Sequence, residues 1–290
     1  MFKALYLFWI IIFSKGELWK VMDLIAYILL GVIQGIFEWL PVSSQGISVV
    51  VLMNMFNVAP QLAIDMSIFL HLGTVIAALV YFWKDIKELF TKTNYSDLLK
   101  FNKNLKFDNT TQVSRFILVS VFFTLLIGVP IYFLVKQNVT AEMVGILTIA
   151  IGVLLIITGL LQVKINKAKK AIPKFTAKDA FWVGSAQGLS VIPGVSRSGM
   201  TTSVLLFRGN NPETAFKYSF LLSIPTILIA EIGLLVINGF VFSPMILVSV
   251  AMAFIFGYLT IGMLMKIAKK LEFSYFCFVL GIAYILIGIL

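Results

Sequence analysis

Long apolar runs dominate this sequence and limit what it can fold into. Six runs of roughly 20 residues are long enough to cross the hydrocarbon core of a bilayer, about 30 Å thick, as helices. They cover residues 62–83, 113–135, 143–163, 215–238, 244–265 and 273–290. Only 12% of the residues are charged, whereas a soluble globular protein carries roughly 25%. The sequence therefore predicts an all-α polytopic membrane protein with about six transmembrane helices, and excludes a soluble enzyme, a nucleic-acid binder and a disordered chain.

Two further apolar segments, 24–57 and 179–207, are interrupted near their middle by proline, glycine and serine. The interruptions read LPVSSQG at 40–46 and IPGVSRSG at 192–199. We expect each segment to form a re-entrant helix hairpin. Non-helical backbone inside a membrane must be buried in protein or line a wet cavity, because lipid offers its N–H and C=O groups no partner. Both turns are therefore candidates for building a functional site.

The basic residues predict the orientation of the chain. If segment 179–207 enters and leaves the membrane on one side, 18 of the 23 Lys and Arg residues fall on that side. Only Lys136 then lies in a loop on the opposite side. Loops rich in Lys and Arg stay in the cytoplasm. The formal charge of +10 therefore indicates orientation, and no nucleic-acid partner is expected.

Two smaller features bear on processing and redox chemistry. The single cysteine, Cys277, leaves no disulfide framework and no cysteine-based metal site. Residues 1–21 form an N-terminal extension with two open interpretations. Their apolar run at 2–13 resembles a signal peptide, whereas Met22 offers an alternative start just before the first interrupted segment.

The two interrupted segments resemble each other. Four positions match at an offset of 153: Gln34 with Gln187, Gly35 with Gly188, Ser43 with Ser196, and Gly46 with Gly199. Three positions match at an offset of 152: Ser67 with Ser219, Thr74 with Thr226, and Ala78 with Ala230. We infer an internal duplication, with a first repeat at 22–135 and a second at 136–290. Because three predicted spans separate the hairpins, the second copy is inverted, and the two turns are expected to meet near the midplane.

Charged residues stand in both turns. A charge at the bilayer centre costs roughly 2.5–3.5 kcal/mol, so Arg197 needs a partner or a use. One interpretation is a structural ion pair with Glu38 that joins the repeats. The other is an anion site, in which the guanidinium fork binds phosphate oxygens beside the N–H groups of a helix start. Glu231 also lies deep in a predicted span, and no role is assigned to it.

The other polar groups near the turns also have more than one interpretation. Glu38 follows Gln34 by four residues, so both share a helix face. Its carboxylate suits either a divalent cation beside phosphate oxygens or acid–base catalysis. Ser43 and Ser44 suit helix capping, nucleophilic attack, or both. His71, the one histidine, is more often a packing residue at such a position, and its role is uncertain.

Two stretches of this sequence resemble the motifs of a known family. QGIFEWLPVSSQG at 34–46 and PGVSRSGMTTS at 193–203 are similar to the two motifs of the undecaprenyl-diphosphate phosphatases associated with bacitracin resistance. Their order, spacing and inverted duplication also agree, and the resemblance covers residues 22–290. It implies a multi-pass plasma-membrane enzyme that hydrolyses undecaprenyl diphosphate to the monophosphate, the lipid carrier of cell-envelope glycans. It further implies that the protein uses a divalent cation, Mg²⁺ or Ca²⁺, and contacts membrane lipids. It is compatible with a homodimer and implies a site open to the outer face.

The same resemblance implies roles for individual residues. Catalytic roles fall on Glu38, Ser44 and Arg197. Glu38 is the acidic or metal-linked residue, and Ser44 is the nucleophile or a hydroxyl ligand. Arg197 clamps the diphosphate and stabilises charge on the transferred phosphoryl group. Substrate-binding roles fall on Gln34, Ser43, Gly194, Ser196, Ser198 and Thr201.

One position departs from the family pattern. The first motif commonly continues with a histidine after its glycine, but here Ile47 follows Gly46. An imidazole beside the serine would be the obvious general base. Its loss leaves three routes open: Glu38 as the base, a metal-bound hydroxide, or His71 if the bundle brings it near. The alternative function is a transporter or flippase for polyprenyl phosphate on the same inverted-repeat scaffold.

Overall fold

The structure is a computed structural model that describes residues 24–98, 109–138, 140, 143–163, 175–238, 244–267 and 274–289. The regular elements in these ranges are helices. Four stretches are long and apolar enough to cross a membrane, and shorter apolar helices accompany them: the four are Pro60–Tyr81, Thr110–Asn138, Pro212–Ile237 and Met245–Lys266. The prediction of an all-α membrane protein is confirmed at this level. The predicted extension at 1–21 lies outside the described residues.

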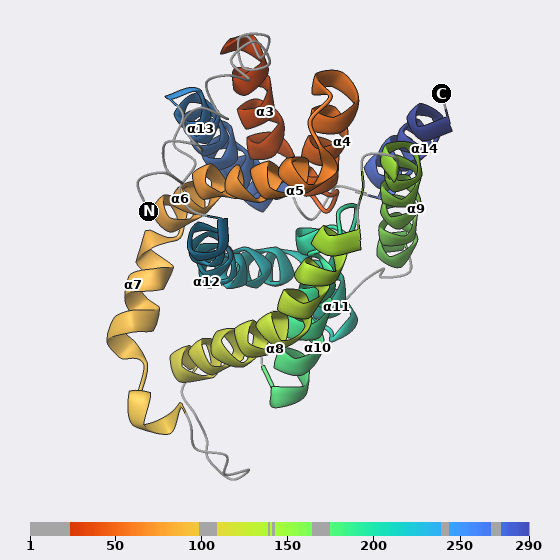
Figure 1. Cartoon of the computed structure of the whole chain (residues 1–290). Coiled ribbons are helices and arrows are strands. Elements are labelled where there is room, and N and C mark those ends of the chain that lie inside the picture. The colour runs from red at the N-terminus through yellow and green to blue at the C-terminus, as the bar shows by residue number, and fades with distance from the viewer. Residues whose placement is uncertain are drawn as a thin grey trace.

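The two interrupted apolar segments fold as helix–turn–helix pairs (Figure 1). The first pair is α3 (Leu24–Phe37) with α4 (Ser44–Phe56), and the second is α10 (Ala177–Leu189) with α11 (Arg197–Phe207). At 1.5 Å per residue, these helices are roughly 17–21 Å long. Each is too short to cross a hydrocarbon core of about 30 Å alone.

A serine starts the second helix of each pair. Ser43 caps α4 and accepts a hydrogen bond from the N–H of Gly46 over 3.0 Å. Ser196 caps α11 and accepts one from the N–H of Gly199 over 3.1 Å. Such caps satisfy an N–H group that the first helical turn leaves without a partner. Helix capping, one of the two interpretations of Ser43, is confirmed.

The remaining helices surround these two pairs. They are α5 (Pro60–Phe69), α6 (His71–Tyr81), α7 (Trp83–Lys92), α8 (Asn109–Asn138), α9 (Val144–Val163), α12 (Pro212–Asn238), α13 (Pro244–Ile267) and α14 (Ser274–Ile289), with a 3₁₀ turn at Tyr95–Asp97. In Figure 1, α3, α4, α5, α6 and α13 form the upper part of the molecule, and α8, α10 and α11 form the lower part. Helices α9 and α14 pair at one side.

The predicted span at 62–83 is interrupted at Leu70, which separates α5 from α6. The ring Nδ1 of His71 lies 2.8 Å from the carbonyl oxygen of Ser67 and 3.0 Å from that of Ile68. A side chain that takes these carbonyls competes with the main-chain hydrogen bonds of the helix, which is a common cause of kinks. The interruption makes His71 the first residue of α6.

Helix α3 packs closely along α13 through two glycines. A Cβ at Gly31 would lie 2.3 Å from the carbonyl oxygen of Ser249, and one at Gly35 would lie 2.7 Å from the main-chain nitrogen of Gly257. Ser249 Oγ donates a hydrogen bond to the carbonyl of Tyr27 over 2.7 Å. Small residues allow helix backbones in membranes to approach closely. These glycines therefore fix α3, and the turn that follows it, against α13.

Helix α10 packs along α8 in the same manner. A Cβ at Gly184 would lie 2.3 Å from the carbonyl oxygen of Ser120, and one at Gly188 would lie 2.8 Å from Cβ of Ile127. Ser120 Oγ donates to the carbonyl of Ala180 over 3.2 Å. The three α10 residues in these contacts follow their α3 counterparts by 153 positions. This is the offset that relates the two turns.

A matched pair of glycine substitutions tests this packing. Gly31→Ala is expected to lower the free energy of unfolding by roughly 1–3 kcal/mol, because the added methyl overpacks the α3–α13 contact. Gly233→Ala is the control, since a Cβ at Gly233 meets nothing within 4 Å. It should be neutral or stabilising by roughly 0.5–1 kcal/mol. Thermal unfolding in detergent measures both, and equal melting temperatures for the two variants would contradict the packing described.

Candidate active site

The two hairpin turns are in direct contact. The main-chain N–H of Gly194 donates to Ser43 Oγ over 3.2 Å, and Ser198 Oγ donates to the carbonyl of Leu40 over 2.6 Å. Gly194 has a φ of 98°, and a Cβ there would lie 2.8 Å from Cα of Ile151 in α9. Only glycine suits such a position. The expectation that the turns meet is confirmed.

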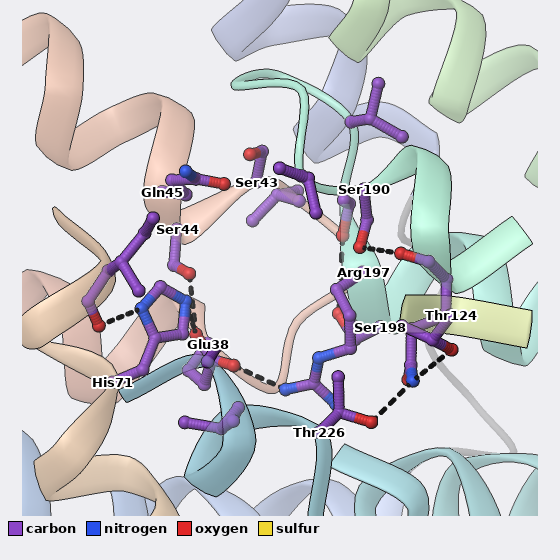
Figure 2. A pocket seen from close by; sticks show the side chains of 18 residues that line it. Glu38, Ser43, Ser44, Gln45, His71, Thr124, Ser190, Arg197, Ser198 and Thr226 are labelled. Carbon is purple, nitrogen blue, oxygen red and sulfur yellow. Dashed lines mark hydrogen bonds and ion pairs between the residues drawn. The ribbon is translucent and has the colours of Figure 1, made fainter. Parts of the chain in front are cut away.

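Glu38 lies where the turns meet, and its side chain is only 2% exposed. Its Oε2 accepts hydrogen bonds from Gln34 Nε2 and Ser44 Oγ, each over 2.7 Å, and lies 3.1 Å from His71 Nε2. Its Oε1 forms an ion pair with Nη2 of Arg197. Figure 2 shows Ser44, His71 and Arg197 around this carboxylate. The ion pair considered from the sequence is present, and it joins the two hairpins.

Arg197, the first residue of α11, has donors left for a ligand. Its Nη2 is engaged by Glu38, while Nη1 lies 3.5 Å from the carbonyl oxygen of Ser219. The guanidinium carbon lies 5.5 Å from the centre of the Trp39 ring, within range of a cation–π interaction. The side chain lines the pocket and is 14% exposed. A guanidinium carries five N–H donors, so the ion pair and anion binding are compatible in one side chain.

The hydrogen-bond partners of His71 assign the protons of its ring. A carbonyl oxygen can only accept, so the contacts of Nδ1 with the carbonyls of Ser67 and Ile68 require a proton on Nδ1. The other nitrogen, Nε2, faces Glu38 Oε2. One proton therefore lies between the imidazole and the carboxylate. Because Ser44 Oγ also bonds to Oε2, the imidazole and the hydroxyl share one oxygen of Glu38.

The position of His71 bears on the absence of the family histidine at position 47. Ile47 packs in an apolar cluster with Val42, Val50 and Ile151 and offers no proton chemistry. The imidazole beside the serine comes instead from His71, which the helix break at Leu70 brings to the turn. Of the three routes left open by the sequence, two have their geometry present: Ser44 Oγ donates to Glu38 Oε2, and His71 Nε2 lies 3.1 Å from the same oxygen. The structure places His71 on the pocket wall in contact with Glu38, and its part in catalysis stays a prediction.

The remaining predicted residues fall into two groups. Those that line the pocket are Ser43, Ser196 and Ser198. Gln34, Gly194 and Thr201 do not line it. Gln34 supports Glu38 from α3, and Gly194 acts through its main chain. The hydroxyl of Thr201 lies 2.5 Å from Ser219 Oγ. The structure therefore places these three behind the pocket surface, where they support it.

Several pocket residues were not predicted. The pocket encloses about 710 Å³, including its open mouth, and also presents the polar side chains of Gln45, Thr124, Gln187, Ser190 and Thr226. Figure 2 shows Thr124, Ser190 and Thr226 across the pocket from Ser44 and His71. Gln187 and Thr226 were visible in the sequence as matches between the repeats. Nothing in the sequence indicated that α8 supplies Thr124.

The metal-ligating side chains of the described residues do not form a metal site made of protein ligands alone. In the part of the chain that the structure describes, His, Cys, Asp and Glu form no group of three or more that could hold a metal ion. Glu38 is the one carboxylate that lines the pocket, and both of its oxygens are engaged by protein groups. Mg²⁺ and Ca²⁺ need six or more oxygen ligands. The described residues that line the pocket therefore supply one carboxylate ligand, and their other oxygen groups are neutral hydroxyls and amides.

Glu231 is a second buried carboxyl near the pocket. It is 4% exposed, and its Oε1 has no hydrogen-bond partner among the described residues. It lies one turn beyond Ile227 on α12, and Ile227 lines the pocket. Glu231 is close enough to His71 to interact with it electrostatically.

The chain is similar to known membrane proteins over most of its length. Residues 27–283 match the family model of the bacitracin resistance protein BacA. The undecaprenyl-diphosphatase of Methanococcoides burtonii is 39% identical over 260 residues, covering 89% of this chain and 96% of that protein. The undecaprenyl-diphosphatases of Methanothrix thermoacetophila and Haloarcula marismortui are each 34% identical, over 90% and 88% of this chain and 95% and 93% of those proteins. The chain therefore belongs to the family of the bacitracin resistance protein BacA.

Proposed function

We propose that this protein hydrolyses a polyprenyl diphosphate, such as undecaprenyl diphosphate, to the monophosphate and inorganic phosphate. The observation that carries the proposal is the buried cluster of Glu38, Ser44, His71 and Arg197 at the contact of the two turns. It combines a phosphate-binding guanidinium, a hydroxyl and a proton acceptor in one pocket. The names of the similar proteins support this choice of substrate. Hydrolysis would return the lipid carrier for cell-envelope glycan synthesis.

Ser44 is the proposed nucleophile. Its hydroxyl already donates to Glu38 Oε2, so the proton can pass to this carboxylate as Oγ forms a bond to the terminal phosphorus. The bridging P–O bond breaks, and the lipid monophosphate leaves with the bonding electrons. Arg197 stabilises the charge that develops on the phosphoryl and bridging oxygens. Water then hydrolyses the phosphoserine and restores Ser44.

His71 supports the carboxylate in this scheme. Its Nε2 shares a proton with Glu38 Oε2, the oxygen that also accepts from Ser44. It therefore keeps this carboxylate ionised and oriented towards Ser44, as an acceptor of the serine proton must be. Gln34 holds the same carboxylate from α3.

We propose that the divalent cation, Mg²⁺ or Ca²⁺, arrives on the diphosphate. Mg²⁺ commonly keeps several waters and binds through substrate phosphates and one or two carboxylates. A single engaged carboxylate, Glu38, suits this mode better than a dedicated protein site. The cation would neutralise phosphate charge, which Arg197 cannot do alone.

We infer that the two hairpins are re-entrant and belong to an inverted repeat with six spans. The α3–α13 and α10–α8 contacts support this, because equivalent residues make them and each joins one repeat to the other. Gly152 of α9 and Gly281 of α14 extend the pattern, since each faces the carbonyl of the other. Ser120 and Ser249 are 129 positions apart, as are Gly152 and Gly281. Helices α8 and α9 are therefore the counterparts of α13 and α14, and we extend the first repeat from residue 135 to the end of α9.

We further propose a plasma-membrane location with the basic loops in the cytoplasm. The distribution of Lys and Arg supports this orientation. The first hairpin, 24–57, then enters from outside, and the pocket opens to the outer face. A homodimer is compatible with this arrangement. Membrane lipids surround the apolar helices, and the polyprenyl tail reaches the pocket from the bilayer.

Phosphate release tests the proposal. Purified protein with Mg²⁺ and a polyprenyl diphosphate in detergent or liposomes is expected to release inorganic phosphate. A transporter would instead bind the lipid and move it between leaflets without releasing phosphate. That result would overturn the proposal in favour of the alternative function.

A histidine substitution tests the support given to the carboxylate. His71→Gln is expected to lower kcat roughly 10- to 100-fold, because Glu38 would still accept the serine proton but would lose a group that keeps it ionised and oriented. Ile47→Val is the control, since it changes the position where the family pattern has a histidine. Its rate should stay within about 2-fold of wild type. Equal rates for the two variants would show that His71 has no part in the reaction.

A further inference from the structure

Gln187 has a different role from Gln34, its counterpart in the first repeat. Gln34 donates to Glu38, the residue four positions further on the same helix. Four positions beyond Gln187 stands Val191, whose side chain cannot accept a hydrogen bond. The amide of Gln187 therefore turns to the neighbouring helices. It lines the pocket, which Gln34 does not.

Two threonines fix the orientation of this amide. Gln187 Nε2 donates to Thr124 Oγ1 of α8 over 3.0 Å and to Thr226 Oγ1 of α12 over 2.8 Å. The hydroxyl of Thr124 in turn donates to the carbonyl of Ser120, and that of Thr226 to the carbonyl of Leu222. Because both hydroxyl protons are committed, the threonines can only accept from the amide. Nε2 must face them, and Oε1 must face away.

The carbonyl oxygen of Gln187 is therefore an acceptor held in a fixed direction. The residue is 1% exposed, and Oε1 has no hydrogen-bond partner among the described residues. A buried acceptor without a partner is costly. It would repel an ionised phosphate oxygen and would instead accept from an O–H group. The rest of the pocket, with Arg197 and the serine hydroxyls, offers donors that suit phosphate.

The place of Gln187 in the pocket wall suits the second half of the proposed reaction. The attacking and leaving oxygens in phosphoryl transfer lie roughly in line through phosphorus. Water that hydrolyses phosphorylated Ser44 must therefore approach from the side opposite Ser44 Oγ. Thr124, Ser190 and Thr226 lie on that side of the pocket (Figure 2), and Gln187 bonds to two of them.

We propose that Gln187 Oε1 holds the water that hydrolyses the phosphoserine at Ser44. The proposal rests on the proposed function. The water oxygen forms the new bond to phosphorus as the bond between phosphorus and Ser44 Oγ breaks. Glu38 returns to Oγ the proton that it took in the first step. One proton of the water stays on the inorganic phosphate, and the other leaves to solvent.

Gln187→Leu tests the proposal. Loss of the acceptor is expected to lower kcat roughly 10- to 100-fold with KM changed less than about 3-fold, since binding of the diphosphate does not use this oxygen. Phosphorylated Ser44 should accumulate and be detected by mass spectrometry of protein quenched in acid. Thr226→Val, which removes one bond to the amide, should give a smaller change of the same kind.

Ser185→Ala is the matched control. Ser185 lies on the same helix, has a buried hydroxyl without a hydrogen-bond partner among the described residues, and does not line the pocket. Its kcat should stay within about 2-fold of wild type, and melting temperatures in detergent check that all variants fold. The proposal is overturned if Gln187→Leu matches Ser185→Ala, or if its kcat falls without phosphoserine accumulation. Wild-type protein that releases no phosphate would instead refute the hydrolase function itself.

Discussion

Replacing Arg197 by alanine is expected to lower the rate of phosphate release roughly 10²–10³-fold. This is the usual effect of removing one group that stabilises charge in a transition state. Arg197 has this position because its guanidinium lines the pocket, with one nitrogen on Glu38 and other donors left for phosphate oxygens. The measurement is the initial rate of phosphate release at saturating polyprenyl diphosphate.

Two further variants separate a catalytic loss from an unstable fold. Arg197→Ala leaves Glu38 without its ion-pair partner, and breaking a buried pair costs roughly 3–5 kcal/mol. Arg197→Lys keeps the charge but loses the planar fork, so it should fold and still lose most of the rate. Arg208→Ala is the control, because Arg208 pairs with Asp179 outside the pocket. Undiminished turnover in Arg197→Lys and Arg197→Ala would refute the role of Arg197.

Replacing Glu38 by glutamine is expected to lower phosphate release roughly 10³–10⁴-fold, near the upper limit for loss of a general base. Glutamine has a similar shape but cannot accept the proton of Ser44. Both Ser44 and His71 depend on Oε2 of this carboxylate. Phosphate release measured alongside the melting temperature would separate lost chemistry from lost stability.

A charge exchange tests whether the Glu38–Arg197 pair is only structural. The double variant Glu38→Arg with Arg197→Glu restores opposite charges at the contact of the turns. If the pair served stability alone, the exchange would preserve activity. We expect it to recover part of the stability lost in the single variants and none of the phosphate release, because Ser44 would then face a guanidinium. Activity near that of wild type would contradict the catalytic account.

The sequence predicted those features that follow from the residue types within a short motif. Ser43 and Ser196 stand just before helices and cap them, as their residue type favours. Glu38 and Arg197 are opposite charges in two apolar turns, and burial makes their pairing favourable. The contact of the two turns was predicted from the odd number of apolar runs expected to span the membrane between them.

The sequence was uninformative wherever a role depends on contacts between distant helices. His71 reaches Glu38 because the α5–α6 helix breaks at Leu70, and the carbonyl contacts that accompany this break depend on one side-chain conformation. Gln187 depends on threonines from α8 and α12. The glycine at position 31 indicates a close helix contact, but the sequence does not identify α13 as the partner helix.

The central claim is that the pocket between the turns performs hydrolysis. Wild type and Glu38→Gln, reconstituted side by side in liposomes with a synthetic polyprenyl diphosphate and Mg²⁺, test it most directly. The account predicts that wild type releases one inorganic phosphate for each diphosphate consumed, and that the variant binds the lipid but releases almost none. Lipid binding without phosphate release by wild type, or equal release by both proteins, would contradict it.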